Sequence, residues 1–119
     1  MHARKTGALI RASAVSGAIM AGATADVVSA IDRYATDVGL AFQIVDDILD
    51  VEGQAEQLGK TAGKDAKQGK PTYVSAIGLP AARRLADELR QEAQAAIAEL
   101  GTRASRLAEL ADFIVLRKF

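Results

Sequence analysis

Cysteine is absent from the 119 residues, and the chain has one histidine, two prolines, three phenylalanines and two tyrosines. Without cysteine it can form no disulfide framework, iron–sulfur cluster, thiol nucleophile or cysteine-type zinc site. The single histidine, His2, cannot form a histidine metal site alone. Two prolines leave most of the chain free to be helical, and few aromatic residues argue against a typical β-sheet.

The charge is balanced, with 15 Lys plus Arg and 15 Asp plus Glu. This balance argues against a dedicated nucleic-acid binder, which needs an excess of positive charge. Arg4, Lys5 and Arg11 precede the uncharged segment 12–25, which superficially resembles a secretory signal. That segment is rich in small residues and shorter than the ~20 residues that span a membrane. We therefore expect a buried helix there, no membrane span and a cytoplasmic protein.

The apolar half of the chain is dominated by small residues, with 25 alanines, which suits closely packed helices. We predict an all-α fold in which 1–119 form a single partial domain with four main helices. The main helices are predicted over 5–20, 25–51, 80–100 and 104–116, with a short helical turn over 72–77.

Glycine and proline mark the expected ends of these helices. Gly53 is expected to cap the second helix in a left-handed conformation, and Gly101 to close the third. Pro80 is expected at a helix start. The segment 53–71, which contains four glycines and four lysines, is predicted to be a loop.

An acidic strip on the second predicted helix is the most informative feature. In helical projection Gln43, Asp46, Asp47 and Asp50 share one side, and the rest of the circumference is apolar. A helix that is apolar nearly all round is buried. Carboxylates taken out of water need a partner, and Mg²⁺ is a common one, bound by one or two carboxylates together with substrate phosphate oxygens.

A lysine-rich segment follows the acidic strip. Residues 41–59 contain five acidic residues and no basic ones, whereas 60–70 contain four lysines and one aspartate. This arrangement suits a metal–diphosphate ligand, with carboxylates holding the cation and ammonium groups neutralising the phosphate. Lys64 and Lys67 are interpreted as solvated surface charge.

Two common ligand-binding loops do not fit this region. Gly59, Lys60 and Thr61 invite comparison with a phosphate-binding P-loop, but the pattern requires glycine at position 54, where the chain has Gln54. An EF-hand calcium loop is excluded because Ile48 occupies a ligand position.

Several motifs in order resemble the C-terminal part of trans-isoprenyl diphosphate synthases, the polyprenyl synthetase family, and particularly its bacterial short-chain farnesyl and geranylgeranyl diphosphate synthases. The second aspartate-rich motif of that family matches Phe42-Gln43-x-x-Asp46-Asp47-x-x-Asp50. The further matches are Lys5-Thr6-Gly7, the loop Leu58-Gly59-Lys60 through Gly69-Lys70-Pro71-Thr72-Tyr73, and the ending Ala111 to Arg117.

The resemblance implies a metal and diphosphate site. Asp46 would coordinate Mg²⁺, for which Mn²⁺ could substitute, and Asp47 and Asp50 would act through water or hydrogen bonds. The implied ligands of the allylic diphosphate are Lys5, Lys60 and Lys70.

The same resemblance implies how the rest of the substrate is held. Thr6 and Gln43 would line the path of the forming carbocation. Phe42 would pack against the isoprenoid tail, and Arg117 would close over the homoallylic diphosphate.

The implied activity is the Mg²⁺-dependent condensation of an allylic diphosphate with isopentenyl diphosphate to a longer isoprenyl diphosphate, in a full-length homodimer. The first aspartate-rich motif of the family and most of its isopentenyl diphosphate pocket have no counterpart in the chain. We therefore expect a C-terminal fragment that is inactive alone and self-associates through an exposed apolar face.

Three other interpretations compete. The chain could be a non-catalytic helical subunit that partners a complete synthase, in which case the acidic strip would not need to bind Mg²⁺–diphosphate. A terpene cyclase is disfavoured because its second metal motif usually contains Asn, Ser or Thr and Glu. A helical bundle without chemistry is the remaining possibility.

Overall fold

The computed structural model describes residues 2–57 and 72–117, and within them the side chains of 5–53 and 72–117. Every element in these two stretches is helical and none is a strand, which confirms the predicted all-α fold. The elements are α1 (His2–Met20), α2 (Ala25–Gln57), α3 (Tyr73–Ile77), α4 (Leu79–Ala96), the 3₁₀ helix η1 (Ala98–Ala104) and α5 (Ser105–Leu116).

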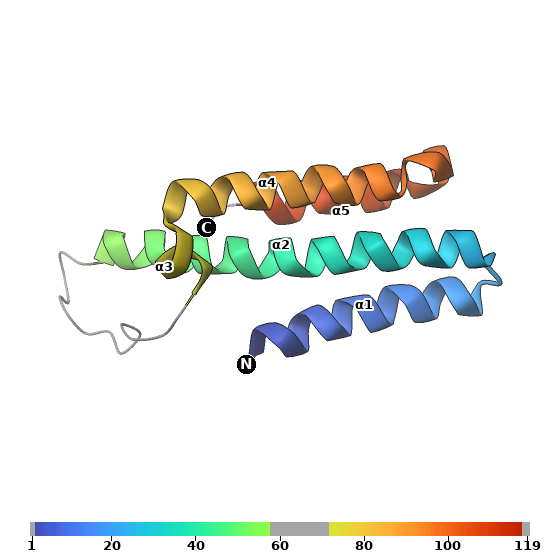
Figure 1. The fold of residues 1–119 in the computed structure, drawn as a ribbon, viewed down its shortest axis with the longest axis horizontal. Coiled ribbons are helices and arrows are strands. Elements are labelled where there is room, and N and C mark those ends of the chain that lie inside the picture. Colours follow the sequence, from blue (N-terminus) through green and yellow to red (C-terminus); the bar gives the residue numbers. More distant parts are fainter. Residues whose placement is uncertain (1, 58–71, 118–119) are drawn as a thin grey trace.

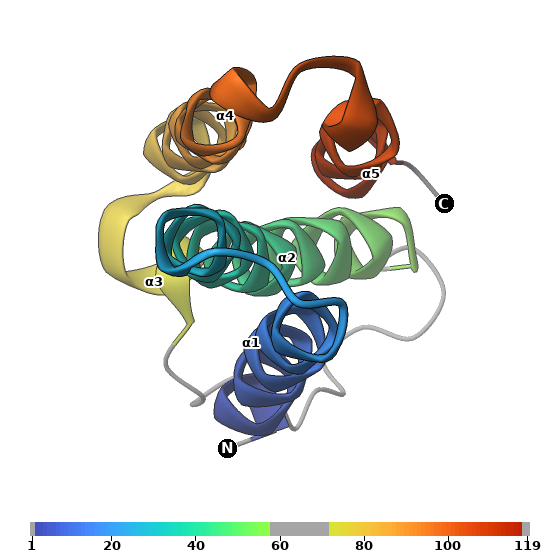
Figure 2. The ribbon, with the colours of Figure 1, turned by 90° about the vertical axis from the view of Figure 1, so that its right-hand side faces the viewer.

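The long helix α2 is the central element of the fold. The helix α1 runs back along one side of α2, and α4 and α5 lie on the opposite side (Figure 1). Viewed end-on, α4 and α5 sit next to each other above α2, with α1 below (Figure 2). The turn between α1 and α2 contains Gly22, whose φ of 80° favours glycine.

Two groups of buried residues hold α4 and α5 on α2. The first comprises Ile31, Tyr34, Ala35, Val38, Ala93, Ile97, Ala104 and Ala111. The second comprises Ala41, Ile44, Val45, Ile48, Leu49, Ala82, Ala86 and Leu89. The contribution of α4 to both groups is mainly alanine, so its backbone can approach α2 closely, as the small-residue composition predicted.

Hydrogen bonds of buried and half-buried side chains also join α5 to α2 and to α4. The Tyr34 hydroxyl donates a 2.7 Å hydrogen bond to the carbonyl of Leu107, which joins α2 to α5. On α4, the guanidinium of Arg90 donates to carboxylate oxygens of Asp87 (Nη2, 2.6 Å) and Asp112 (Nη1, 2.9 Å), and so joins α4 to α5. These contacts fix the long α4–α5 hairpin in one register.

Two predicted helix ends were wrong. The helix α2 continues through Gly53 to Gln57. Just before Gly53, Glu52 forms an ion pair with Arg83 of α4. The helix α4 stops at Ala96 rather than at residue 100. Its last turn passes into η1, which reverses the chain while Ile97 stays buried. The φ of 66° at Gly101 lies inside η1.

Several large apolar side chains are exposed. On α1 these are Leu9, Ile19 and Met20, and on α5 they are Leu110, Phe113 and Leu116. The expected self-association of the chain remains a prediction. These exposed side chains are the candidates for the apolar face through which it would occur. Within the described residues no helix combines the length and apolar character needed to cross a membrane.

The helices α1 and α2 approach closely where two glycines meet. A Cβ atom placed on Gly39 would lie 3.2 Å from the Cα atom of Gly7. Because the obstacle is backbone, it cannot be relieved by a side-chain rotation, and any larger residue at position 39 would push the two helices apart.

We therefore expect Gly39→Ala to weaken the packing of α1 on α2, despite the better helix propensity of alanine. The matched control is Gly17→Ala, because a Cβ at Gly17 of α1 meets no atom within 4 Å. The control should raise the free energy of unfolding by about 0.5–1 kcal/mol. Urea denaturation of both variants checks this, and equal stabilisation by both would contradict the close contact.

A pH dependence follows from Asp37 of α2. Burial raises the pKa of Asp37, and Glu92 of α4 raises it further through its charge and a hydrogen bond, while Arg33 opposes the shift. A raised native pKa gives stability that is complete below the ordinary aspartate pKa of about 3.9 and is lost as the pH rises through the native value. Asp37→Asn should therefore raise Tm at pH 7, with a difference that shrinks towards pH 4.

The control for this prediction has the opposite sign. The hydrogen bond from Arg11 lowers the pKa of Asp32, so this carboxylate contributes stability above its ordinary pKa that is lost on acidification. Asp32→Asn should lower Tm at pH 7. Thermal unfolding followed by circular dichroism between pH 4 and pH 7 measures both variants, and a lower Tm of Asp37→Asn at pH 7 would contradict the assignment.

Candidate functional site

The acidic strip lies on a part of α2 that is anchored in the core. Ile44, Val45, Ile48 and Leu49 are buried in the second group of core residues, on the side of α2 that meets α4. The alternating carboxylates therefore project from the remaining side of a helix segment that cannot easily rotate. Helical periodicity from the sequence identified this division, and the core packing fixes it.

The strip itself is more exposed than the sequence suggested. Asp46 and Asp50 are exposed, and Gln43 and Asp47 are only partly buried. The expectation that these carboxylates are taken out of water was therefore wrong for the described residues. Among the described elements, α1, α3, α4 and α5 pack against α2 and leave Asp46 and Asp50 exposed.

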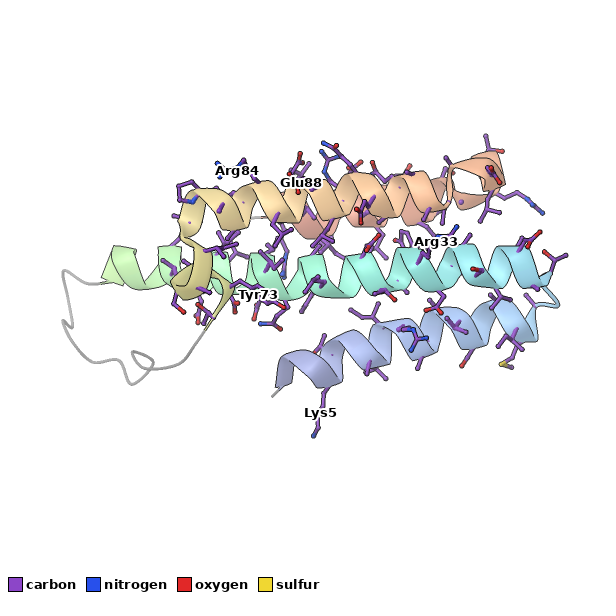
Figure 3. The ribbon with its side chains drawn as sticks, in the orientation of Figure 1. Lys5, Arg33, Tyr73, Arg84 and Glu88 are labelled. Atoms are coloured by element: carbon purple, nitrogen blue, oxygen red, sulfur yellow. The ribbon has the colours of Figure 1, made fainter. Side chains whose placement is uncertain are left out.

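Asp47 accepts two hydrogen bonds, one through each carboxylate oxygen. Its Oδ1 accepts a 3.0 Å bond from Nε2 of Gln43, one turn earlier on α2. Its Oδ2 accepts a 3.1 Å bond from the backbone N–H of Tyr73, the first residue of α3. The short helix α3 is thereby fixed beside α2, where Figure 3 shows Tyr73.

The start of α3 is closed by a reciprocal capping box. The Thr72 hydroxyl accepts from the Ser75 N–H at 3.0 Å, and the Ser75 hydroxyl accepts from the Thr72 N–H at 2.8 Å. Sequence reasoning assigned Thr72 and Tyr73 to a motif but gave the Tyr73 backbone no role. The Thr-x-x-Ser spacing of the capping box could have indicated that a helix begins at Tyr73.

Phe42 and Arg117 come together at the other end of the strip. The guanidinium carbon of Arg117 lies 4.6 Å from the centre of the Phe42 ring. Its Nη2 donates to the Phe42 carbonyl at 3.3 Å, and its Nε donates to the Ile114 carbonyl at 3.0 Å. The end of α5 is thus attached to the start of the aspartate segment.

The other predicted site residues are less closely gathered. Lys5 of α1 is exposed and points away from α2 (Figure 3), while Thr6 is partly buried. The contact of Gly7 with Gly39 sets this end of α1 against α2, close to the level of the strip. Lys60 and Lys70, predicted to hold diphosphate, lie outside the described residues.

The carboxylates of the strip suit a hard cation whose remaining coordination positions are filled by oxygens of a bound ligand. Among the described side chains, no three Asp, Glu or His residues are placed to hold a metal ion together. Asp46 and Asp50 lie one turn apart on the exposed side of α2 and offer only oxygen donors. Mg²⁺ commonly binds through one or two carboxylates plus phosphate oxygens, so the residues present fit that cation.

Comparison with known proteins agrees with this arrangement. A family model described as polyprenyl synthetase matches residues 1–110. The chain belongs to the polyprenyl synthetase family. It is 49% identical over 117 residues to a dimethylallyltranstransferase of Fischerella ambigua. The matched region covers 98% of the chain and 34% of that protein.

Other relatives in the polyprenyl synthetase family show similar identity. The chain is 50% identical over 114 residues to a probable farnesyl diphosphate synthase of Bradyrhizobium diazoefficiens, covering 92% of the chain and 34% of that protein. It is 46% identical over 118 residues to geranylgeranyl pyrophosphate synthase 11, chloroplastic, of Arabidopsis thaliana, covering 98% and 33%. The chain thus spans about a third of the length of the curated relatives it matches.

The contact between Arg117 and Phe42 yields a stability prediction. Replacing Arg117 by Gln should lower the free energy of unfolding by about 1–2 kcal/mol, because a cation–π contact and a hydrogen bond between α5 and α2 are lost. Arg117→Lys should restore little, since an ammonium cannot stack and donate in the same geometry. Urea denaturation measures both, with Arg106→Gln on the exposed side of α5 as the control.

Proposed function

We propose that the chain is the part of a prenyl diphosphate synthase that binds a divalent cation together with a diphosphate. In the whole protein this part would serve the condensation of an allylic diphosphate with isopentenyl diphosphate. The single observation that carries the proposal is the exposed strip of carboxylates on a helix whose other sides are anchored in the core. Membership of the polyprenyl synthetase family supports it.

Each residue of the strip has a distinct task in this proposal. Asp46 is the carboxylate that meets the cation, with Asp50 one turn away on the same exposed side. The cation, Mg²⁺ or in its place Mn²⁺, would neutralise the charge that develops on the departing diphosphate. Lys5, Lys60 and Lys70 are proposed to share the phosphate charge, and Thr6 and Gln43 to face the allylic carbon with their oxygen dipoles.

Phe42 and Arg117 are proposed to form the apolar and basic border of the site. The face of Phe42 that is not covered by Arg117 would contact the isoprenoid tail. Because the Arg117 guanidinium already serves Phe42 and Ile114, its proposed role toward the second diphosphate requires it to leave or share these partners.

The wider setting is part of the same proposal. The chain is proposed to act as a partial domain within a cytoplasmic homodimeric synthase, and 1–119 alone are expected to catalyse no prenyl transfer. The alternative is a non-catalytic helical subunit that partners a complete synthase. The two differ in one measurable property, since a pure scaffold has no reason to bind Mg²⁺ with diphosphate.

We expect the purified chain to bind inorganic pyrophosphate in the presence of Mg²⁺ and much more weakly in its absence. Asp46→Asn should weaken this binding about tenfold or more, because a hard cation loses a charged oxygen ligand. Glu88→Gln, which changes an exposed carboxylate on α4 (Figure 3), should leave it within about twofold because of screening. Isothermal titration calorimetry measures all three proteins.

Two results would contradict the proposal. Pyrophosphate binding that is equally strong with and without Mg²⁺ would mean that the carboxylates do not act through a cation. Complete absence of binding in the unmodified chain would favour the scaffold alternative. Transfer of a dimethylallyl group to isopentenyl diphosphate by 1–119 alone would contradict the expected inactivity.

A further inference from the structure

We propose that Asp47 is a positioning residue that tethers α3 to the aspartate helix, and that it is not a ligand of the cation. This inference rests on the proposed function of the strip and assigns Asp47 a task different from that of Asp46. Two hydrogen bonds carry it, from Gln43 Nε2 to Oδ1 at 3.0 Å and from the Tyr73 N–H to Oδ2 at 3.1 Å.

The helix α3 is short and lies at the edge of the described core, so a tether at its start bears directly on its position. It has five residues and none of them is buried. A helix of that length has no stability of its own in water. Val74 packs only at the edge of the second core group, so the capping box and the bond to Asp47 supply most of the polar contacts that locate the start of α3.

The tether acts directly beside the proposed cation site. Asp46 and Asp47 are adjacent in sequence, but Asp46 is exposed whereas Asp47 is partly buried between Gln43 and α3. Both oxygens of Asp47 are therefore directed at protein donors. We infer that the position of Tyr73 and of the start of α3 depends on this carboxylate, which neighbours Asp46 in the sequence.

The isosteric variant Asp47→Asn separates positioning from metal binding. The asparagine oxygen can accept from the Tyr73 N–H, and its amide can donate to Gln43 once the Gln43 amide turns over. Both tethering bonds survive, while the negative charge that a cation ligand requires is lost. Asp47→Ala loses the charge and both bonds, and Thr72→Val weakens the cap of α3 without changing Asp47.

The experiment measures Mg²⁺-dependent pyrophosphate binding and the hydrogen exchange of the Tyr73 amide by NMR, on the full 119-residue chain. Asp47→Asn should bind within about threefold of the unmodified chain, because a screened charge change alone is small. Its Tyr73 amide should stay protected. Asp47→Ala and Thr72→Val should weaken binding about tenfold or more, with faster exchange at Tyr73.

The outcomes that overturn the inference are distinct. Binding by Asp47→Asn as weak as by Asp46→Asn would make Asp47 a ligand, and unchanged binding by Asp47→Ala would deny it any task. If the unmodified chain binds no pyrophosphate, the proposed function fails, and exchange alone decides the tether. Protection of Tyr73 that is kept in Asp47→Asn and lost in Asp47→Ala then supports it, whereas equal exchange in both variants overturns it.

Discussion

The packing of α2 against α4 is the constraint on which the rest of the structure depends. Ile44, Val45 and Ile48 are buried against the alanines of α4, so α2 is fixed in its rotation about its own axis. That rotation decides which residues of 42–50 face solvent. A turn of 100° would bury carboxylates without partners, at a cost of several kcal/mol each, so the core and the acidic strip enforce the same arrangement.

The site is assembled from separate segments that converge on this one helix. The end of α5 reaches α2 through Arg117 and Phe42, the start of α3 reaches it through Tyr73 and Asp47, and α1 reaches it where Gly7 meets Gly39. Each of these contacts is local and partly polar. Small changes at them should alter ligand binding while the helical content of the chain stays the same.

Large apolar side chains of α1 and α5 are exposed in the described residues. Relatives in the polyprenyl synthetase family are about three times as long as this chain. In the described residues the side of α2 opposite the acidic strip is packed on α4. We therefore propose cation–diphosphate binding for the 119-residue chain and complete prenyl transfer only for the whole protein.

Sequence alone determined the all-α class and the division of α2 into apolar and acidic sides, because helical periodicity is written in the order of residues. It also placed Pro80 at a helix start, which the structure confirms. It placed the ends at Gly53 and Leu100 wrongly. The helix α2 continues past Gly53 to Gln57, and Glu52 near this end pairs with Arg83 of α4, a contact between distant segments that periodicity does not contain.

Only the tertiary structure decided the partners of the site residues. The resemblance implied a role for Asp47 through water or hydrogen bonds without naming a partner, and the packing of α3 supplies that partner by directing the Tyr73 N–H at its carboxylate. In the same way the fold brings Arg117 onto Phe42, a contact that their spacing in the sequence does not predict. Spacing along a helix fixes which side a residue faces, whereas its partner depends on which other segment the fold brings to that side.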